Sequence, residues 1–135
     1  MLSFLEMGVG GVEVHRIFFY RDRRGNSPVK DYLKELDAKG GKDARIKRTK
    51  IREYVKALEV NGTNLPENYC KLIEGEIWEL RPLSERVFFF GWYNGSFVLL
   101  HHFTKKTQKT PRLEIDKAKR EMEDFIERWN ENGTD

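Results

Sequence analysis

The stretch that decides the fold covers residues 78–111 and reads WELRPLSERVFFFGWYNGSFVLLHHFTKKTQKTP. At its centre are two runs of apolar and aromatic residues, Arg86–Tyr93 and Ser96–Phe103, which predict two β-strands. Asn94-Gly95 lies between these runs, and both residue types tolerate the positive φ angles of a two-residue turn. We therefore expect an antiparallel β-hairpin.

A two-residue turn also fixes which residues face each other across the hairpin. It places Trp92 opposite Phe97 and Arg86 opposite Phe103. Because side chains alternate along a strand, His101 then shares a face of the sheet with Arg86.

Basic residues flank the hairpin on both sides. Arg81 and Arg86 precede or begin its first strand. Lys105, Lys106 and Lys109 follow its second strand, in a loop without an acidic residue. The hairpin therefore brings cations that are distant along the chain to one rim of the sheet. Such a cluster suits a polyanion, and RNA is the first candidate.

Local signals place the elements before the hairpin. Val12–Tyr20 predicts a strand. Ser27-Pro28 is typical of a helix start, and Gly40-Gly41 of its end. A second helix should begin near Asp43 and stop at Gly62. The tight linker between these helices predicts an antiparallel helical hairpin.

The remaining signals complete an α+β fold. Ile77–Arg81 predicts a strand that Pro82 ends, and Cys70–Ile73 is a candidate for a further short strand. Thr110 followed by Pro111 predicts a capped start for a final amphipathic helix. The expected order is β-α-α-β-β-β-α. We expect a mostly antiparallel sheet with an N-terminal helical hairpin and a C-terminal helix.

Length and composition indicate one domain. The chain has 135 residues, of which 39% are hydrophobic, so we expect a single domain over residues 12–130 after a weakly ordered leader at residues 1–11. The single cysteine excludes an internal disulfide and a cysteine-based zinc site. No signal peptide or run of about 20 apolar residues is visible, which favours a cytoplasmic protein.

The formal net charge of +3 hides an uneven distribution. Eight basic and two acidic residues lie between Lys39 and Lys56, whereas residues 113–135 carry eight acids and four bases. Within the basic segment, the residues Arg45, Arg48, Arg52 and Lys56 recur at helical spacing and form one stripe. A solvated helix face is the default interpretation of this stripe. The more specific interpretation is that the stripe contacts the backbone of RNA.

This element order, with these residues, resembles the RelE/HigB superfamily of bacterial toxins, and most closely its phage-derived HigB-type branch. The matching stretches are Ile77–Arg81, Arg86–Phe89, Leu99–His101, Phe103–Pro111 and Glu114-Ile115 with Ala118. The resemblance covers roughly residues 12–129. The loop of lysine, threonine and glutamine that ends in proline is its most specific part.

The resemblance implies the toxin of a type II toxin–antitoxin system. Such a toxin is an endoribonuclease that cleaves mRNA in the ribosomal A site, where the ribose 2′-hydroxyl attacks the neighbouring phosphate without a metal or cofactor. Its partners would be a HigA-like helix-turn-helix antitoxin, the ribosome and mRNA, with operator DNA bound only through the antitoxin complex. Carried over by position, Arg81 and Arg86 contact the scissile phosphate, and Lys106 with the adjacent Lys105 supplies the basic residues after the last strand.

The general base stays open at this stage. The resemblance implies lysines on the strand before the first arginine, but Ile77 and Glu79 occupy those places. Histidine titrates nearest to neutral pH, and the expected register favours His101 over His102. Glu79 and Lys105 are the other candidates.

Two further interpretations compete with a nuclease. In the first, Arg86 only pairs with an acid such as Glu79 or Glu85, as structural arginines do. The chain would then be a non-catalytic relative that binds an antitoxin and takes part in operator DNA or RNA binding. It could also be a plain interaction domain of a phage-derived operon.

Overall fold

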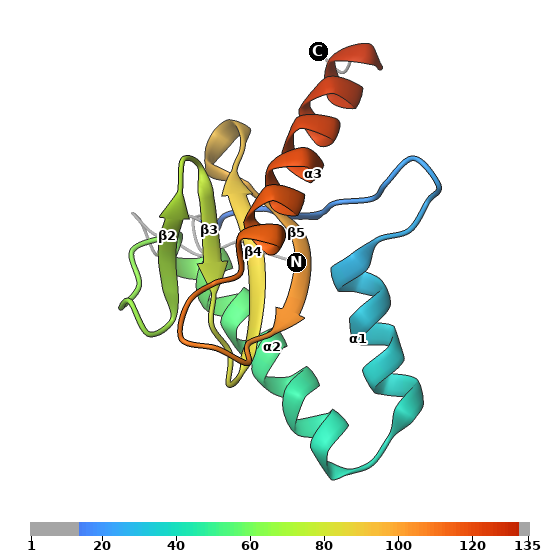
Figure 1. Cartoon of the computed structure of the whole chain (residues 1–135), viewed down its shortest axis with the longest axis vertical. Helices are drawn as coiled ribbons and strands as arrows, with labels where there is room; N and C mark the ends of the chain where they lie inside the picture. The colour runs from blue at the N-terminus through green and yellow to red at the C-terminus, as the bar shows by residue number, and fades with distance from the viewer. Residues whose placement is uncertain (1–13, 133–135) are drawn as a thin grey trace, which may run out of the picture.

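The computed structural model describes residues 14–132 (Figure 1). The leader at residues 1–11 and the start of the strand expected from Val12 lie outside this range. The helices and strands, in chain order, are β1 (Ile17–Phe19), α1 (Pro28–Lys39), α2 (Lys42–Asn61), β2 (Cys70–Glu74), β3 (Ile77–Leu80), β4 (Glu85–Gly91), β5 (Phe97–Thr104) and α3 (Arg112–Glu131).

The strands form one sheet in the order β1-β5-β4-β3-β2. β1 pairs parallel with β5, and the other neighbours pair antiparallel, so the mostly antiparallel sheet of an α+β fold is confirmed. Four strands follow the two helices, where the expected order had three. The additional strand, β2, turns back into β3 at Gly75, whose φ of 55° suits a tight turn.

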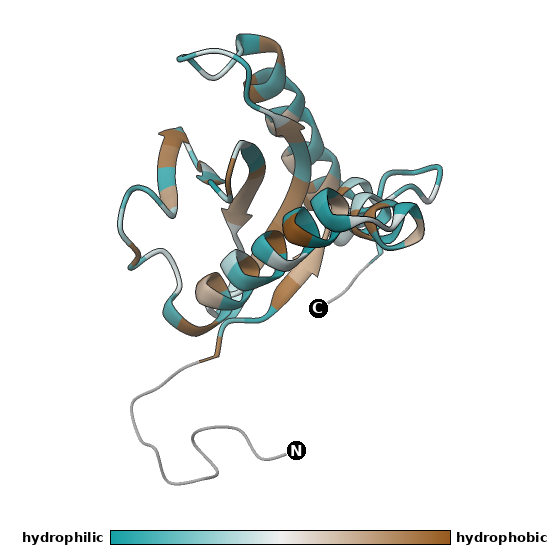
Figure 2. Cartoon of the chain, turned by 90° about the horizontal axis from the view of Figure 1, so that it is seen from below, coloured by the Kyte–Doolittle hydropathy of each residue, from teal (hydrophilic) through white to brown (hydrophobic). Residues whose placement is uncertain are grey.

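Helices cover both faces of the sheet, as Figure 1 shows for α2 behind the strands and α3 in front of them. Apolar side chains of α1 and α2 pack with one set of strand residues, which includes Val87, Phe89 and Leu99. Those of α3 pack with the alternate set, which includes Phe88, Phe90 and Val98. Figure 2 accordingly shows hydrophobic residues concentrated on the strands. The central strands β4 and β5 carry apolar residues on both faces because each face meets a helix.

The predicted ends of α1 and α2 are confirmed to within a residue. Ser27 precedes α1, although its hydroxyl donates a hydrogen bond to the Tyr20 carbonyl at 2.8 Å and accepts none from the N–H groups of the first helical turn. Gly40 and Gly41 have φ angles of 67° and 88°, which separate the two helices. Gly62 closes α2 by donating its N–H to the Leu58 carbonyl at 2.8 Å.

The turn of the β4–β5 hairpin is longer than predicted. Tyr93–Gly95 forms a single 3₁₀ turn, so Gly91, and not Trp92, lies opposite Phe97. The N–H of Trp92 donates to the Ser96 carbonyl at 2.8 Å, which leaves three residues in the loop. The expected pairing of Trp92 with Phe97 was therefore wrong.

A β-bulge then restores the register further along the hairpin. Val87 pairs with His102 and Phe89 with Leu99, so two residues of β5 lie opposite the single residue Phe88. The extra residue offsets the longer turn, and Arg86 lies opposite Phe103 as predicted.

Candidate functional site

Arg81 lies directly after β3, where Pro82 ends the strand. Its N–H donates a hydrogen bond to the Tyr69 carbonyl at 2.9 Å, and its guanidinium Nη1 donates to the Glu67 carbonyl at 3.1 Å. The side chain is 21% exposed. One end of the guanidinium is therefore anchored to the segment before β2, while the group keeps access to solvent.

Arg86 is the second residue of β4, and the preceding turn holds its guanidinium. Nη1 donates to the Leu83 carbonyl at 2.9 Å and to the Glu85 carbonyl at 2.8 Å. Burial lowers the pKa of Arg86 from its ordinary value, and the nearby Glu79 carboxylate opposes this change. An arginine keeps its charge at neutral pH in such surroundings.

Glu79 lies between the two arginines and is 1% exposed. Its Oε1 is 3.5 Å from Nε of Arg81 and 3.7 Å from Nε of Arg86. The structural pairing that competed with the functional interpretation is thus present. However, Glu79 is one carboxylate shared by two guanidinium groups, and the buried Glu85 carboxylate also acts on the charge of Arg86. The buried Nε of Arg86 has no hydrogen-bond partner among the described residues.

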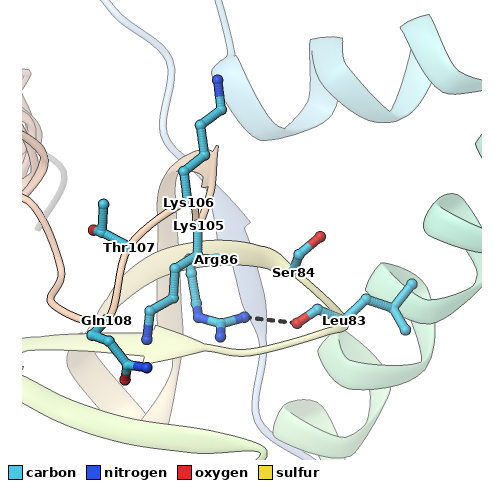
Figure 3. A pocket seen from close by; sticks show the side chains of 7 residues that line it. All are labelled: Leu83, Ser84, Arg86, Lys105, Lys106, Thr107 and Gln108. Atoms are coloured by element: carbon cyan, nitrogen blue, oxygen red, sulfur yellow. Dashed lines mark hydrogen bonds between the residues drawn. The ribbon is translucent and has the colours of Figure 1, made fainter.

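An open pocket lies beside the Arg86 guanidinium (Figure 3). Its lining residues are Leu83, Ser84, Arg86, Lys105, Lys106, Thr107 and Gln108. Three of these seven carry a positive charge, and none carries a negative charge. The structure therefore brings Arg86, Lys105 and Lys106 together, whereas Arg81 connects to the pocket through Glu79.

The lysine loop is tied to the turn before β4. The N–H of Lys105 donates to the Ser84 carbonyl at 2.7 Å, across the hairpin from Arg86. In Figure 3 the side chains of Lys105 and Lys106 extend in opposite directions, as expected for consecutive residues that continue a strand. Lys109 lies outside the pocket lining, and its carbonyl accepts a hydrogen bond from the Thr107 hydroxyl at 2.8 Å.

Thr110 has a different role from the predicted helix cap. The N-cap of α3 is Pro111, and the Thr110 hydroxyl donates to Oε2 of Glu79 at 3.2 Å. The first helical turn presents N–H donors and no free acceptor, so the hydroxyl proton of Thr110 is donated to the Glu79 carboxylate. Glu79 therefore joins both arginines and the far end of the lysine loop.

His101 lies on the α3 face of the sheet, but the structure does not bring it to the pocket. Its ring is 2% exposed. Nδ1 lies 2.6 Å from Oε1 of Glu121, and Nε2 lies 2.9 Å from Oε1 of Glu114. Both ring nitrogens are engaged by carboxylates of α3, so neither is free to accept a proton from a substrate. The expectation that His101 shares the rim with the arginines and lysines is corrected on this point.

His102 lies on the opposite face, as strand alternation predicted. Its ring stacks on Tyr32 of α1 with 3.6 Å between ring centroids. Burial lowers the pKa of His102, which disfavours the charged imidazolium. Of the four candidates for the base, Lys105 is therefore the one that lines the pocket.

The basic stripe of α2 is only partly compensated. Arg48 forms an ion pair with Asp37 of α1, and Lys56 Nζ lies 3.1 Å from Oε1 of Glu59. Arg45 and Arg52 form no ion pair within residues 14–132. A shallow depression on this surface is lined by Arg48, Thr49, Arg52, Glu53 and Lys56.

Leu83, Ser84 and Gln108 were not singled out from the sequence as site residues. All three line the pocket. The usable signal for Leu83 and Ser84 was their position, because a turn between the two candidate arginines must lie at the same rim. Gln108 carried no comparable signal beyond its place in the lysine loop.

Metal centres and membrane-spanning helices are two other classes of feature. No group of three or more His, Cys, Asp or Glu side chains in residues 14–132 is arranged to hold a metal ion. None of the helices in that range combines the length and apolar character that a bilayer crossing requires.

Comparison with known proteins supplies the family. The model of the phage-derived Gp49-like proteins (DUF891) matches residues 31–123, which is well over half of the chain and includes β3, β4, β5 and the lysine loop. The chain has no significant match among curated proteins. The resemblance to RelE/HigB toxins is confirmed at this level, and the chain belongs to the phage-derived Gp49-like family, a RelE/HigB-like toxin family of toxin–antitoxin systems.

Proposed function

We propose that this protein is the toxin of a type II toxin–antitoxin system, of the HigB-type branch, and that it cleaves ribosome-bound mRNA in the cytoplasm. The observation that carries the proposal is the pocket in which Arg86, Lys105 and Lys106 gather without an acidic lining residue. A set of cations that lines one pocket at the rim of a sheet fits a phosphodiester, whose negative charge grows during cleavage.

The chemistry needs no bound group. The 2′-oxygen of the ribose forms a bond to phosphorus while the bond to the 5′-oxygen breaks, which leaves a cyclic phosphate and a 5′-hydroxyl. Arg86 and Arg81 offset the charge of the phosphorane, because guanidinium donates in a planar fork and stays charged. Lys105 is the candidate that, as an uncharged amine, takes the 2′-hydroxyl proton, and the Lys106 ammonium donates a proton to the leaving 5′-oxygen.

Expression of the chain without its antitoxin tests this proposal directly. Induction should arrest growth, and primer extension on translated mRNA should reveal new 5′ ends at ribosomal A sites. Co-expression of a HigA-like helix-turn-helix antitoxin should restore growth, with operator DNA bound only by the pair. A chain that is harmless when expressed alone, with intact mRNA, would refute the nuclease.

We expect the α2 stripe, with Lys109, to contact RNA backbone. Arg52→Ala should weaken ribosome binding at low salt and make the dependence of log K on log salt shallower by about 0.7 to 0.9, as for one lost phosphate contact. Arg48→Ala is the matched control, because Asp37 already compensates Arg48 and the slope should change less. Titration of binding affinity against salt measures both. Equal slopes for wild type and Arg52→Ala would show that this helix face is only solvated and does not contact RNA.

Cleavage should require no divalent ion beyond the Mg²⁺ that keeps the ribosome assembled. The reason is that arginine and lysine side chains supply the charge that a metal would otherwise supply. A chelator selective for Zn²⁺ and Mn²⁺, added to translating ribosomes at fixed Mg²⁺, should leave the cleavage rate unchanged. A loss of cleavage that added Zn²⁺ or Mn²⁺ reverses would contradict the mechanism.

One observation favours a second candidate function. Glu79 and Ile77 occupy the strand positions where the resemblance implies lysines, and both are buried. Glu79 also partly compensates Arg81 and Arg86. A non-catalytic relative that binds an antitoxin and takes part in operator DNA or RNA binding would retain this arrangement. Such a protein would bind its partner yet leave mRNA intact in the primer-extension experiment.

A further inference from the structure

Leu83 has an unusual backbone conformation for a leucine. Its φ angle is 57°, in the left-handed region where the Cβ of an ordinary residue crowds the following carbonyl. Asn94 is the other residue of residues 14–132 that has a positive φ without being glycine, and asparagine tolerates this region. Leucine does not, so the turn at Leu83 is strained.

The strain follows from how the turn serves Arg86. The N–H of Glu85 donates to the Pro82 carbonyl at 2.9 Å, which closes the turn. This turn aims the Leu83 carbonyl at Nη1 of Arg86, 2.9 Å away. Glycine would allow the same turn without strain. The backbone therefore explains the conformation, but it does not explain a leucine side chain at this position.

The side chain of Leu83 gains little from burial in the free protein. It is 49% exposed and is the large aliphatic residue among those that line the cationic pocket. In Figure 3 it lies on one side of the Arg86 guanidinium, while Gln108 lies on the other. A strained and exposed apolar side chain beside a phosphate-binding cluster lacks a structural reason.

We propose that Leu83 packs on the nucleobase next to the scissile phosphate and so contributes to substrate binding. This inference rests on the proposed function. A nucleotide presents an apolar base face one ribose away from its charged phosphate, and proteins that bind single-stranded RNA pack side chains on such faces. The pocket offers a surface for each part of the nucleotide. Arg86 and Lys105 supply cations for the phosphate, and the Leu83 side chain supplies an apolar surface for the base.

Leu83→Gly separates this role from a structural one. The variant removes both the side chain and the strain, so it should melt at a higher temperature than wild type. It should nevertheless raise KM for ribosome-bound mRNA about 5- to 20-fold, as for a lost apolar contact. Because the contact would exist in the ground state and the transition state alike, kcat should change by less than about twofold.

Asn94→Gly is the matched control. It replaces the other non-glycine residue of positive φ, at the opposite end of β4, and leaves the pocket untouched. KM and kcat should equal those of wild type. A second measurement is independent of cleavage: the affinity of each variant for ribosomes that carry mRNA with a 2′-deoxyribose at the cleavage position. Leu83→Gly should weaken this binding by the same factor as it raises KM.

The outcomes separate the two proposals. If wild type binds the deoxy substrate and Leu83→Gly binds it equally well, the role of Leu83 is overturned, whether or not wild type cleaves RNA. If wild type binds but does not cleave RNA, the nuclease fails while weaker binding by Leu83→Gly still supports the contact. If wild type does not bind ribosomes at all, both proposals fall.

Discussion

Replacing Arg86 with alanine is expected to slow cleavage of ribosome-bound mRNA about 100- to 1000-fold, the usual cost of losing one donor that stabilises a transition state. Arg86 lines the pocket with Lys105 and Lys106, and its guanidinium is held by two carbonyl groups, so it needs little reorganisation during reaction. Primer extension in a translation extract, compared with wild type at equal concentration, measures the loss.

The fold should survive this substitution. Glu79 keeps Arg81 at 3.5 Å and the Thr110 hydroxyl at 3.2 Å, so its carboxylate is not left without partners. Arg120→Ala removes a guanidinium from an exposed position on α3 and is the matched control, with cleavage expected to be unchanged. Arg86→Lys should recover only part of the rate, because lysine cannot donate in a fork. Full cleavage by Arg86→Ala would contradict the site assignment.

Replacing His101 with alanine is expected to lower the free energy of unfolding by about 3–5 kcal/mol, the cost of removing one member of a buried hydrogen-bonded network. The imidazole lies between Glu114 and Glu121, and without it the buried Glu121 carboxylate and the partly exposed Glu114 carboxylate each lose this partner. Urea denaturation monitored by circular dichroism measures the change. The effect should also loosen α3, since both contacts join that helix to β5.

The same variant decides between a structural and a catalytic histidine. If His101 only holds α3 on the sheet, the remaining folded protein should cleave mRNA at a rate close to that of wild type at low temperature. A general base would instead show normal stability with a large loss of kcat. His102→Ala is the control on the opposite face, where the ring stacks on Tyr32 and contacts no carboxylate of α3, and its loss of stability should be smaller.

The β4–β5 hairpin shows which structural features the sequence periodicity predicted and which it did not. Asn94-Gly95 correctly located the reversal between β4 and β5, but it did not reveal that Tyr93 joins the loop. The bulge opposite Phe88 was equally hidden, because it depends on how Leu100 and His101 both become buried against α3. The pairing of Arg86 with Phe103 was right because the longer loop and the bulge offset each other.

In the candidate site, too, some residue positions followed from the sequence, whereas other contacts depended on the tertiary structure. Sequence alone placed Arg86, Lys105 and Lys106 at one rim, because their positions at strand ends depend only on the hairpin. It treated Glu79 as one of several candidates for the base. Its actual position between two guanidinium groups depends on the register of β3 with β4, in which Glu79 lies opposite Phe88. That register is a long-range property without a local signal.

By itself, the sequence determined the helices, the α+β class, the hairpin with basic residues at its ends and the toxin family, since each follows from local propensity, spacing or a contiguous motif. The tertiary structure alone decided which of these residues lie in contact with one another. His101 lies between two carboxylates of α3 and not at the rim. The Thr110 hydroxyl donates to Glu79, and Leu83 adopts a strained backbone conformation beside Arg86. The physical reason is that ion pairing and burial act between segments far apart in the chain, where no local pattern records the partner.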